Sequence, residues 1–153
     1  MTTREAINKT MANAKAYTKR YLDAMPGDGY DFKPSAEIRS FAQQMLHLAD
    51  ANYYFISIAT GKPGPLGQVS AEQTVTPTKE ATTKAVMDSY DFVISALSEI
   101  TREQLAETVR FGDLEVPKIA AFVKAYEHQA HHRGQAVIYL RLKGIIPPDG
   151  AIF

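Results

Sequence analysis

"PKIAAFVKAYEHQAHHRGQAVIYLRLKG", residues 117–144, is one of four long segments of the chain that carry helical periodicity. Its apolar residues recur at intervals of three and four, which is the spacing of an amphipathic helix. Pro117 suits a first helical turn, because proline needs no hydrogen-bond partner for its nitrogen there. Gly144 and the pair Pro147–Pro148 are stop signals. The stretch therefore predicts one long helix from Pro117 to about Lys143.

Three further segments have the same periodicity, and no comparable stretch alternates as a strand would. They cover about residues 4–25, 35–60 and 79–100, and Ser35 is the expected N-cap of the second. Four amphipathic helices of this length predict an all-α fold, a four-helix bundle with one long crossover connection. We expect a single domain that spans residues 1–153.

The connections carry weaker signals. The crossover from Gly61 to Pro77 is either a functional cover or a surface loop that joins two distant helix ends. Thr101 and Gln104 have the spacing of a capping box, which predicts a short helical turn. Residues 108–117, "TVRFGDLEVP", fit either a small hairpin around Gly112 or an extended connector.

Composition excludes several classes of protein. Lys plus Arg and Asp plus Glu both number 17, so the chain lacks the positive charge of a nucleic-acid binder or a polybasic membrane-surface protein. The absence of cysteine excludes disulfides and thiolate metal sites. The N-terminal stretch has charges throughout and no apolar core of a signal peptide, and no apolar run approaches a membrane span. We expect a soluble, cytoplasmic protein.

The histidines are the candidate functional residues. His128 and His132 are four residues apart on one helix, so their Cβ atoms lie roughly 5–6 Å apart on one face. Two imidazoles so placed can reach one metal ion. His131 sits about 100° around the helix and is expected to point elsewhere. His47, in "QMLHLADAN", is the natural third ligand from a facing helix, although a hydrogen-bonded core histidine is the alternative for each ring. Gln129 follows His128 where the zinc-protease motif H-E-x-x-H has its glutamate, which makes a metalloprotease a poor fit.

"HQAHHRGQAVIYLRLKGIIPP", residues 128–148, resembles the C-terminal signature of the DinB-like (damage-inducible) family. "PSAEIRSFAQQMLHLADANYYF", residues 34–55, resembles the helix of that family that carries its other histidine. The resemblance covers essentially the whole chain. It implies a soluble four-helix protein and commonly a homodimer. The ligands of one divalent ion would be His47, His128 and His132, with zinc or nickel first and iron or manganese as alternatives. Relatives often have tryptophan before the second helix, where this chain has Tyr30 and Phe32.

Four neighbours of the histidines are candidates for supporting roles. Asp50 and Glu127 are carboxylates that could hold an imidazole tautomer. Arg133 could pair with an acidic side chain near the site or across a dimer interface, and an ordinary surface arginine is the alternative. Gln135 belongs to the same signature string. Gly134 in the middle of a helix predicts the close approach of another helix or of the metal-bearing region, because glycine costs about 1 kcal/mol there relative to alanine.

Two function classes follow from this pattern. Three neutral imidazoles leave a divalent ion with its full charge, which favours ionisation of a bound water or thiol. The resemblance implies a metal-dependent enzyme of the small-thiol transferase or isomerase type, or a hydrolase, that acts on a small-molecule substrate with a low-molecular-weight thiol. The alternative is a non-catalytic metal-binding bundle with a structural or stress-related role. A fourth protein ligand would favour the structural reading, since structural zinc sites are usually closed. A bundle without any metal is the third possibility.

Overall fold

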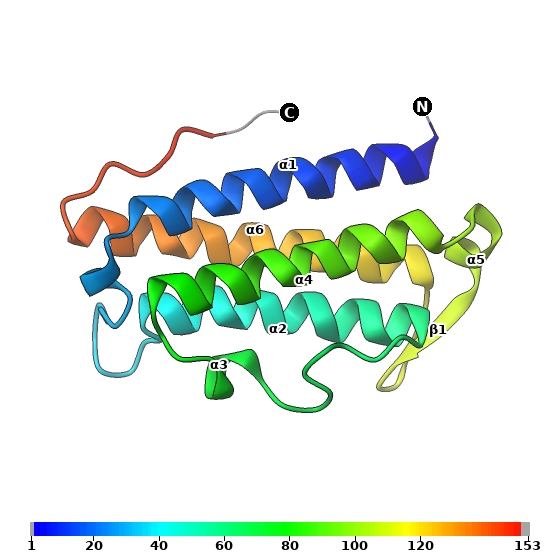
Figure 1. Ribbon diagram of the computed structural model, residues 1–153. Helices are drawn as coiled ribbons and strands as arrows, with labels where there is room; N and C mark the ends of the chain where they lie inside the picture. Colours follow the sequence, from blue (N-terminus) through cyan, green and yellow to red (C-terminus); the bar gives the residue numbers. More distant parts are fainter. Residues whose placement is uncertain (1, 151–153) are drawn as a thin grey trace.

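Four long helices pack side by side in the computed structural model, which describes residues 2–150 (Figure 1). They are α1 (Thr3–Ala24), α2 (Phe41–Thr60), α4 (Lys79–Glu99) and α6 (Lys118–Leu142). Both α1 and α2 pack against α4 and α6, so α1 and α2 occupy diagonal positions of the bundle. The all-α four-helix bundle predicted from periodicity is confirmed. No helix among the described residues is long and apolar enough to cross a membrane.

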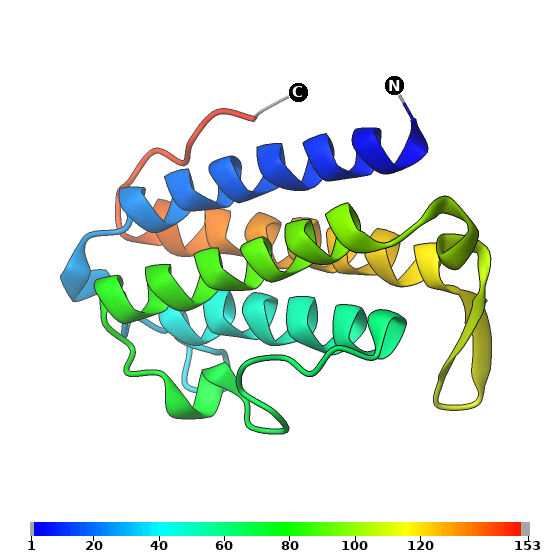
Figure 2. The same cartoon turned by 45° about the vertical axis from the view of Figure 1, so that its right-hand side comes forward.

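The direction of the helices explains the long crossover. Helices α2 and α4 run the same way and pack against each other, whereas α1 and α6 run the opposite way (Figure 1, Figure 2). The chain must therefore travel back along the whole bundle between Thr60 and Lys79. This crossover contains a single helical turn, α3 (Ala71–Thr74), which packs against α2. Gly61 ends α2 in the left-handed conformation with φ of 73°, as expected for a C-terminal glycine.

Residues 108–117 form a hairpin, which is one of the two structures that the sequence allowed for this stretch. Strand β1 (Thr108–Phe111) pairs antiparallel with β2 (Leu114–Pro117), and Gly112 makes the turn with φ of 57°. The short helix α5 (Arg102–Ala106) precedes it and begins with the expected capping box, in which the Thr101 side chain accepts from the Gln104 amide. Pro117 lies just before the first residue of α6, so that the hairpin leads directly into the histidine-bearing helix.

The start of α2 differs from the sequence prediction. The helix begins at Phe41, with Ser40 rather than Ser35 as its N-cap. Ser40 and Gln43 form a complete capping box, which satisfies two amide groups at once. The backbone amide of Phe41 also donates to the Phe32 carbonyl at 3.0 Å, so the preceding segment folds back on the helix end instead of extending it. Ile38, expected on the apolar stripe, is 45% exposed.

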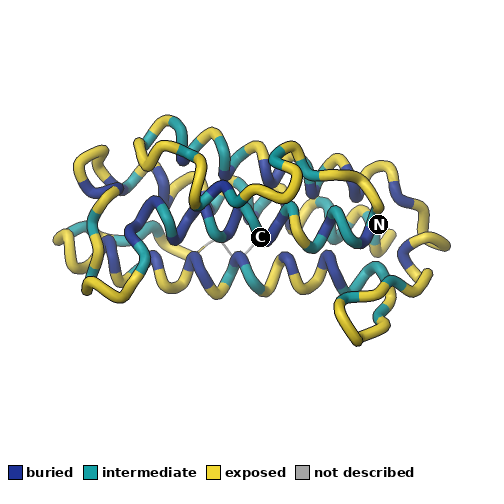
Figure 3. The backbone as a smooth tube through the Cα atoms, turned by 90° about the horizontal axis from the view of Figure 1, so that it is seen from below, coloured by how far each residue is buried: buried dark blue, intermediate teal, exposed yellow. Residues whose placement is uncertain are grey.

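The core lies along the axis of the bundle, where buried faces of the four helices meet (Figure 3). One apolar cluster contains Tyr30, Phe41 and Leu140, and a second contains Met11, Leu97 and Phe122. Each such side chain contributes about 1.5–3 kcal/mol by leaving water. Polar side chains are buried among them, and two lie next to the histidines along α6: Gln129 is fully buried and Arg133 is 8% exposed.

Candidate metal centre

Three histidines from two antiparallel helices lie together. His47 comes from the second turn of α2, and His128 and His132 come from consecutive turns of α6. The ring of His47 lies 4.6 Å from that of His132 and 5.1 Å from that of His128, and the two rings of α6 are 4.3 Å apart. The sequence predicted these three as the ligand set. His131, expected to point elsewhere, is exposed and lies outside the group.

The ring nitrogens have the spacing that one ion requires. One nitrogen from each ring lies within 4.8 Å of the others. The Nε2 atoms of His128 and His132 are 3.1 Å apart. Two nitrogens that each bind one ion at about 2.0–2.1 Å are separated by roughly 3 Å, so the pair fits a shared ion. Among the described residues, the cluster contains no fourth histidine, aspartate or glutamate.

Burial keeps the three imidazoles neutral, which is the form that binds a metal. Burial, followed by the charge of His47, lowers the pKa of His128 to about 4. Burial, followed by the charge of His128, lowers the pKa of His132 to about 3. The pKa of His47 is lowered by burial and then by Arg39, and Glu72 partly offsets this. The side chain of His47 keeps 29% exposure, so the cluster is open to small molecules from this side.

The amide side chain of Gln44 holds His132 and is itself held by Gln135. The amide of Gln44 lies 2.8 Å from Nδ1 of His132, and it is also hydrogen-bonded to the side chain of Gln135. Gln135 in turn lies 2.8 Å from Nε2 of His131. A chain of amides therefore links the buried ligand to the exposed histidine and fixes the orientation of the His132 ring. Gln44 shares a helix face with His47 in the sequence, but its contact with α6 depends on how the helices pack.

The carboxylate beside His47 is Glu72 of α3, a residue that no sequence pattern indicates. Its Oε2 atom lies 3.5 Å from Nδ1 of His47, and its Oε1 atom accepts from Nε of Arg39 at 2.8 Å. Arg39 also lies 3.4 Å from Nδ1 of His47. A carboxylate on the outer nitrogen of a metal-binding histidine fixes which nitrogen faces the ion. Glu72 thus connects the crossover to the histidine cluster.

The sequence analysis suggested that Asp50 holds an imidazole, but its carboxylate contacts α3 instead. It caps α3: its carboxylate accepts from the Ser70 hydroxyl at 2.6 Å and from the backbone amides of Ala71 at 2.6 Å and Glu72 at 3.1 Å. These bonds anchor the turn that carries Glu72. Asp50 therefore acts on His47 through the position of another residue.

Glu127, Arg133 and Gly134 also differ from expectation. Glu127 is exposed and pairs with Lys124 at 2.8 Å, since its side chain points away from the rings. Arg133 faces the interior, where it donates to the Thr18 hydroxyl at 3.2 Å and lies 4.6 Å from the ring of Tyr17. It has no acidic partner among residues 2–150. A Cβ atom added to Gly134 would meet nothing within 4 Å, so no helix of this chain packs closely against it.

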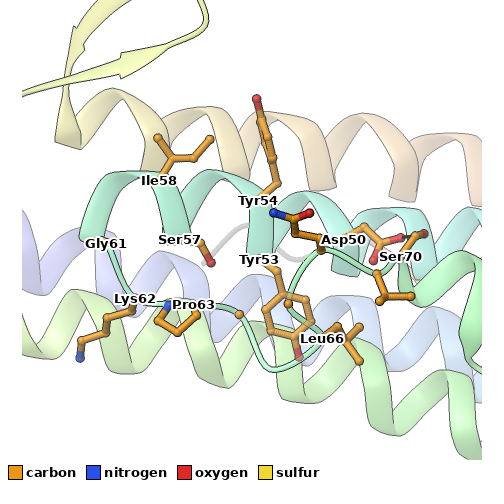
Figure 4. A pocket seen from close by; sticks show the side chains of 14 residues that line it. Asp50, Tyr53, Tyr54, Ser57, Ile58, Gly61, Lys62, Pro63, Leu66 and Ser70 are labelled. Carbon is orange, nitrogen blue, oxygen red and sulfur yellow. Dashed lines mark hydrogen bonds between the residues drawn. The ribbon is translucent and has the colours of Figure 1, made fainter.

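Two cavities adjoin the face of α2 that carries His47. The hairpin cavity, of about 470 Å³, is lined mainly by Tyr54, Phe55, Phe111, Leu114, Val116 and Ala121. The crossover cavity, of about 690 Å³, lies between α2 and the loop that follows it, and its lining includes Asp50, Tyr53, Ser57, Lys62 and Leu66 (Figure 4). Tyr54 lines both. Figure 4 shows its side chain on the side of α2 away from Lys62 and Leu66.

Comparisons with known proteins agree with the fold. A crystal structure of a DinB-like protein from Bacillus cereus superposes with a TM-score of 0.82 at 19% identity, covering 96% of this chain and 97% of the other. A DinB-like protein from Bacillus subtilis gives 0.73 at 19% identity over 91% and 92% of the two chains. A conserved protein from Enterococcus faecalis gives 0.72 at 21% identity over 93% and 97%.

At the level of sequence, none of the curated proteins compared with the chain matches it. The sequence model of the DinB superfamily, however, matches residues 11–136, which include all three clustered histidines and the four long helices apart from their outer ends. This match covers most of the chain and agrees with the resemblance seen in residues 128–148. The protein belongs to the DinB superfamily.

Proposed function

We propose that the protein is a metal-dependent enzyme that transfers a small thiol to an electrophilic small molecule. The observation that carries the proposal is the three-histidine cluster, which has no fourth protein ligand among the described residues and keeps His47 partly exposed. A catalytic site of three protein ligands leaves a position for substrate, whereas a structural site is usually closed.

His47, His128 and His132 would hold the divalent ion. When bound, the ion supplies positive charge that lowers the pKa of a coordinated thiol or water. The protein residues keep this charge available, because neutral imidazoles do not cancel it. Gln44 orients His132, and Glu72 with Arg39 orients His47. In the proposed reaction a sulfur–carbon bond forms, the bond to the leaving group breaks, and the thiol proton and the leaving group depart together as a neutral acid. Hydrolysis and thiol-dependent isomerisation are the related reactions that the same site would support.

Zinc or nickel is the proposed ion, with iron or manganese as alternatives. Imidazole nitrogen suits zinc, nickel, iron and copper, and the cluster contains no thiolate that would select a softer metal. Manganese prefers oxygen ligands, which places it last among the four candidates.

A non-catalytic metal-binding bundle is the second candidate. The three histidines connect α2 to α6, so that an ion held between them would join two helices and contribute to folding free energy. This function requires the ion but no substrate. It predicts that chelation lowers stability while thiols and electrophiles have no effect on the protein.

We also propose a homodimer and a cytoplasmic location. The outer side of α6 exposes Val123, Ile138 and Leu142, at 55%, 54% and 58%, and an apolar surface of this kind suits a second copy. The absence of cysteine is compatible with a reducing compartment.

Elemental analysis of the purified protein tests the metal site first. We expect about one divalent ion per chain, lost in His128→Ala and retained in His131→Ala, which removes a neighbouring histidine outside the cluster. Reconstituted protein is then assayed for the conjugation of 2-mercaptoethanol to 1-chloro-2,4-dinitrobenzene. Turnover by His131→Ala but not by His128→Ala supports the enzyme. Metal binding without turnover across a panel of thiols and electrophiles favours the structural candidate, and equal metal content in both variants refutes the site.

A further inference from the structure

The hairpin cavity has a volume suited to a small organic group. Its 470 Å³ lies within the roughly 300–1,000 Å³ of typical ligand sites. Its walls come from three separate parts of the chain: Tyr54 and Phe55 of α2, the hairpin, and the first turns of α6. Such a cavity between packed elements is a common place for a ligand site.

One aromatic ring, that of Phe55, lies between this cavity and the histidine cluster. The ring of Phe55 lies 5.9 Å from that of Phe111 on the hairpin and 6.1 Å from that of His128. Tyr54 completes the aromatic group, with its ring 5.3 Å from Phe55 and 6.2 Å from Phe111. Phe55 therefore lines the cavity and also neighbours a candidate metal ligand.

The lining determines which chemistry the cavity accepts. Aromatic and aliphatic side chains form most of it, and Lys124 is the one charged side chain among its lining residues. The ammonium of Lys124 already pairs with Glu127 at 2.8 Å, which largely neutralises it. A charged or strongly polar group would lose its hydration here without gaining a partner. A neutral aromatic ring or branched aliphatic group would instead replace water against apolar walls.

The crossover cavity is less suited to this role. Its lining includes the Asp50 carboxylate, the Lys62 ammonium and the Ser57 hydroxyl (Figure 4). The carboxylate of Asp50 is occupied with capping α3. No histidine lines either cavity, but the hairpin cavity combines an apolar lining with Phe55, whose ring neighbours that of the candidate ligand His128.

We propose that the hairpin cavity is the specificity pocket of the site and binds an aromatic or branched aliphatic group of the molecule that reaches the metal. This inference rests on the proposed function, because the reacting group of that molecule has to lie at the histidine cluster. Phe111 and Leu114 are specificity residues supplied by the hairpin, and Phe55 positions both the bound group and His128.

Cobalt-substituted protein tests the pocket by a binding readout. Thiolate binding to cobalt produces a charge-transfer absorption band, which we would titrate with phenylmethanethiol and with ethanethiol. Burial of the phenyl ring should favour phenylmethanethiol over ethanethiol by about tenfold or more. The dissociation constant of phenylmethanethiol should therefore be lower than that of ethanethiol by about this factor. The measured quantity is the ratio of the two dissociation constants.

Two variants and a control locate the preference. Ala120→Phe fills the cavity from α6, and Phe111→Ala removes a wall; both should reduce the ratio several-fold. Leu66→Ala truncates an apolar residue of the crossover cavity and should leave the ratio unchanged. Since Phe111→Ala could unfold the hairpin, Ala120→Phe provides an independent result from α6, and circular dichroism checks the fold of both variants.

The outcomes separate the pocket from the metal function. Equal binding of both thiols by the wild type, or an unchanged ratio in Ala120→Phe, would overturn the pocket while the thiol-binding metal site stands. A protein that binds cobalt but shows no band with either thiol would overturn the thiol-transfer function and the pocket with it.

Discussion

Helix α6 presents two pairs of polar residues at the same spacing, and the pairs differ in how their polar atoms are hydrogen-bonded. His128 and His132 face α2, and Gln129 and Arg133, one residue further along, face the interior between α1 and α4. The second pair is satisfied within the chain: Gln129 accepts from the Tyr90 hydroxyl, and Arg133 donates to Thr18 at 3.2 Å. The histidine pair has Nε2 facing Nε2, and Nδ1 of His128 is buried without a partner among the described residues.

The difference shows how a metal site can be distinguished from a structural polar cluster. Buried polar groups are normally paired within the protein, because an unpaired one costs about 1–3 kcal/mol. The Gln129–Arg133 side follows this rule and requires nothing from outside. On the histidine side, the Nε2 atoms of His128 and His132 face each other at 3.1 Å beside the ring of His47, a spacing that suits a shared cation. Substitutions on each side should therefore have different consequences.

The largest effect is expected for His132→Ala. Loss of one of three ligands should reduce zinc affinity by more than the roughly 10–100-fold typical of a supporting residue, while the metal-free protein stays folded. Competition with a chromogenic chelator measures the affinity, and circular dichroism checks the fold. Gln129→Ala, on the adjacent side of the helix, is the matched control and should retain the ion. Equal loss of zinc in both variants would remove the distinction between the two pairs.

Tyr90→Phe should change stability and leave metal binding intact. The Tyr90 hydroxyl bonds Thr18 at 2.6 Å and also donates to Gln129. Its removal leaves the buried oxygen of Gln129 without a donor, so the free energy of unfolding should fall by about 1–3 kcal/mol. Denaturant titration of chelator-treated protein measures the change. Tyr126→Phe removes a hydroxyl from a 39% exposed ring and should be nearly neutral. If Tyr90→Phe lowers the free energy of unfolding no more than Tyr126→Phe does, the hydrogen bonds of Tyr90 with Thr18 and Gln129 contribute nothing to stability.

The sequence predicted more of the helices and ligands than of the residues that support them. His47, His128 and His132 were identifiable because helical spacing and the signature string are local properties. The Glu72–His47 contact joins residues 25 positions apart across an irregular crossover, and no periodicity encodes it. Ser35 was chosen as N-cap because Pro34 precedes it, but the return of Phe32 onto the helix end favours Ser40. For Arg133 the sequence left an acidic partner and an ordinary surface position open, and it did not indicate the contacts with Tyr17 and Thr18, which lie on a helix distant in sequence.

Acid should weaken the histidine side only. In the folded protein the pKa of His128 is lowered to about 4 and that of His132 to about 3, against about 6.5 when unfolded. Below pH 6.5 the unfolded chain therefore binds protons that the folded chain does not, so the free energy of unfolding of the metal-free protein should fall as the pH drops toward 4. Within the described part of the chain, the Gln129–Arg133 side has no histidine or carboxylate among its hydrogen-bond partners and contributes no such slope.

Thermal unfolding in chelator at pH 7.5, 6.5, 5.5 and 4.5 measures this dependence. The double variant His128→Ala, His132→Ala should show a shallower decline than the wild type over the same range, and the difference in stability between the two should be constant above pH 6.5. Identical profiles would show that the rings take up protons freely in the folded state, contrary to their burial.

Glu72→Gln should weaken metal binding by about tenfold without unfolding the bundle, because a carboxylate on the outer nitrogen of His47 supports its ligand geometry. The same chelator competition measures this change. Glu115→Gln removes a hairpin carboxylate that pairs only loosely with Arg110, at 3.7 Å, and serves as the control. Unchanged affinity in Glu72→Gln would leave Arg39 as the residue that positions the ring.

The smallest effect is expected for Gly134→Ala, at the exposed position that follows Arg133. Glycine inside a helix costs about 0.5–1 kcal/mol relative to alanine, and a Cβ atom at Gly134 would meet nothing within 4 Å. The substitution should therefore raise the stability of the isolated chain by about that amount, and Ala130→Gly, one turn earlier, should lower it similarly. Denaturant titration at low protein concentration measures both.

If the proposed homodimer packs a second helix against Gly134, the added methyl group must weaken association, and sedimentation velocity over a concentration series would show it. A gain in stability with unchanged association places the dimer contact elsewhere on the surface, whereas a loss of stability at every concentration contradicts the open space around this glycine.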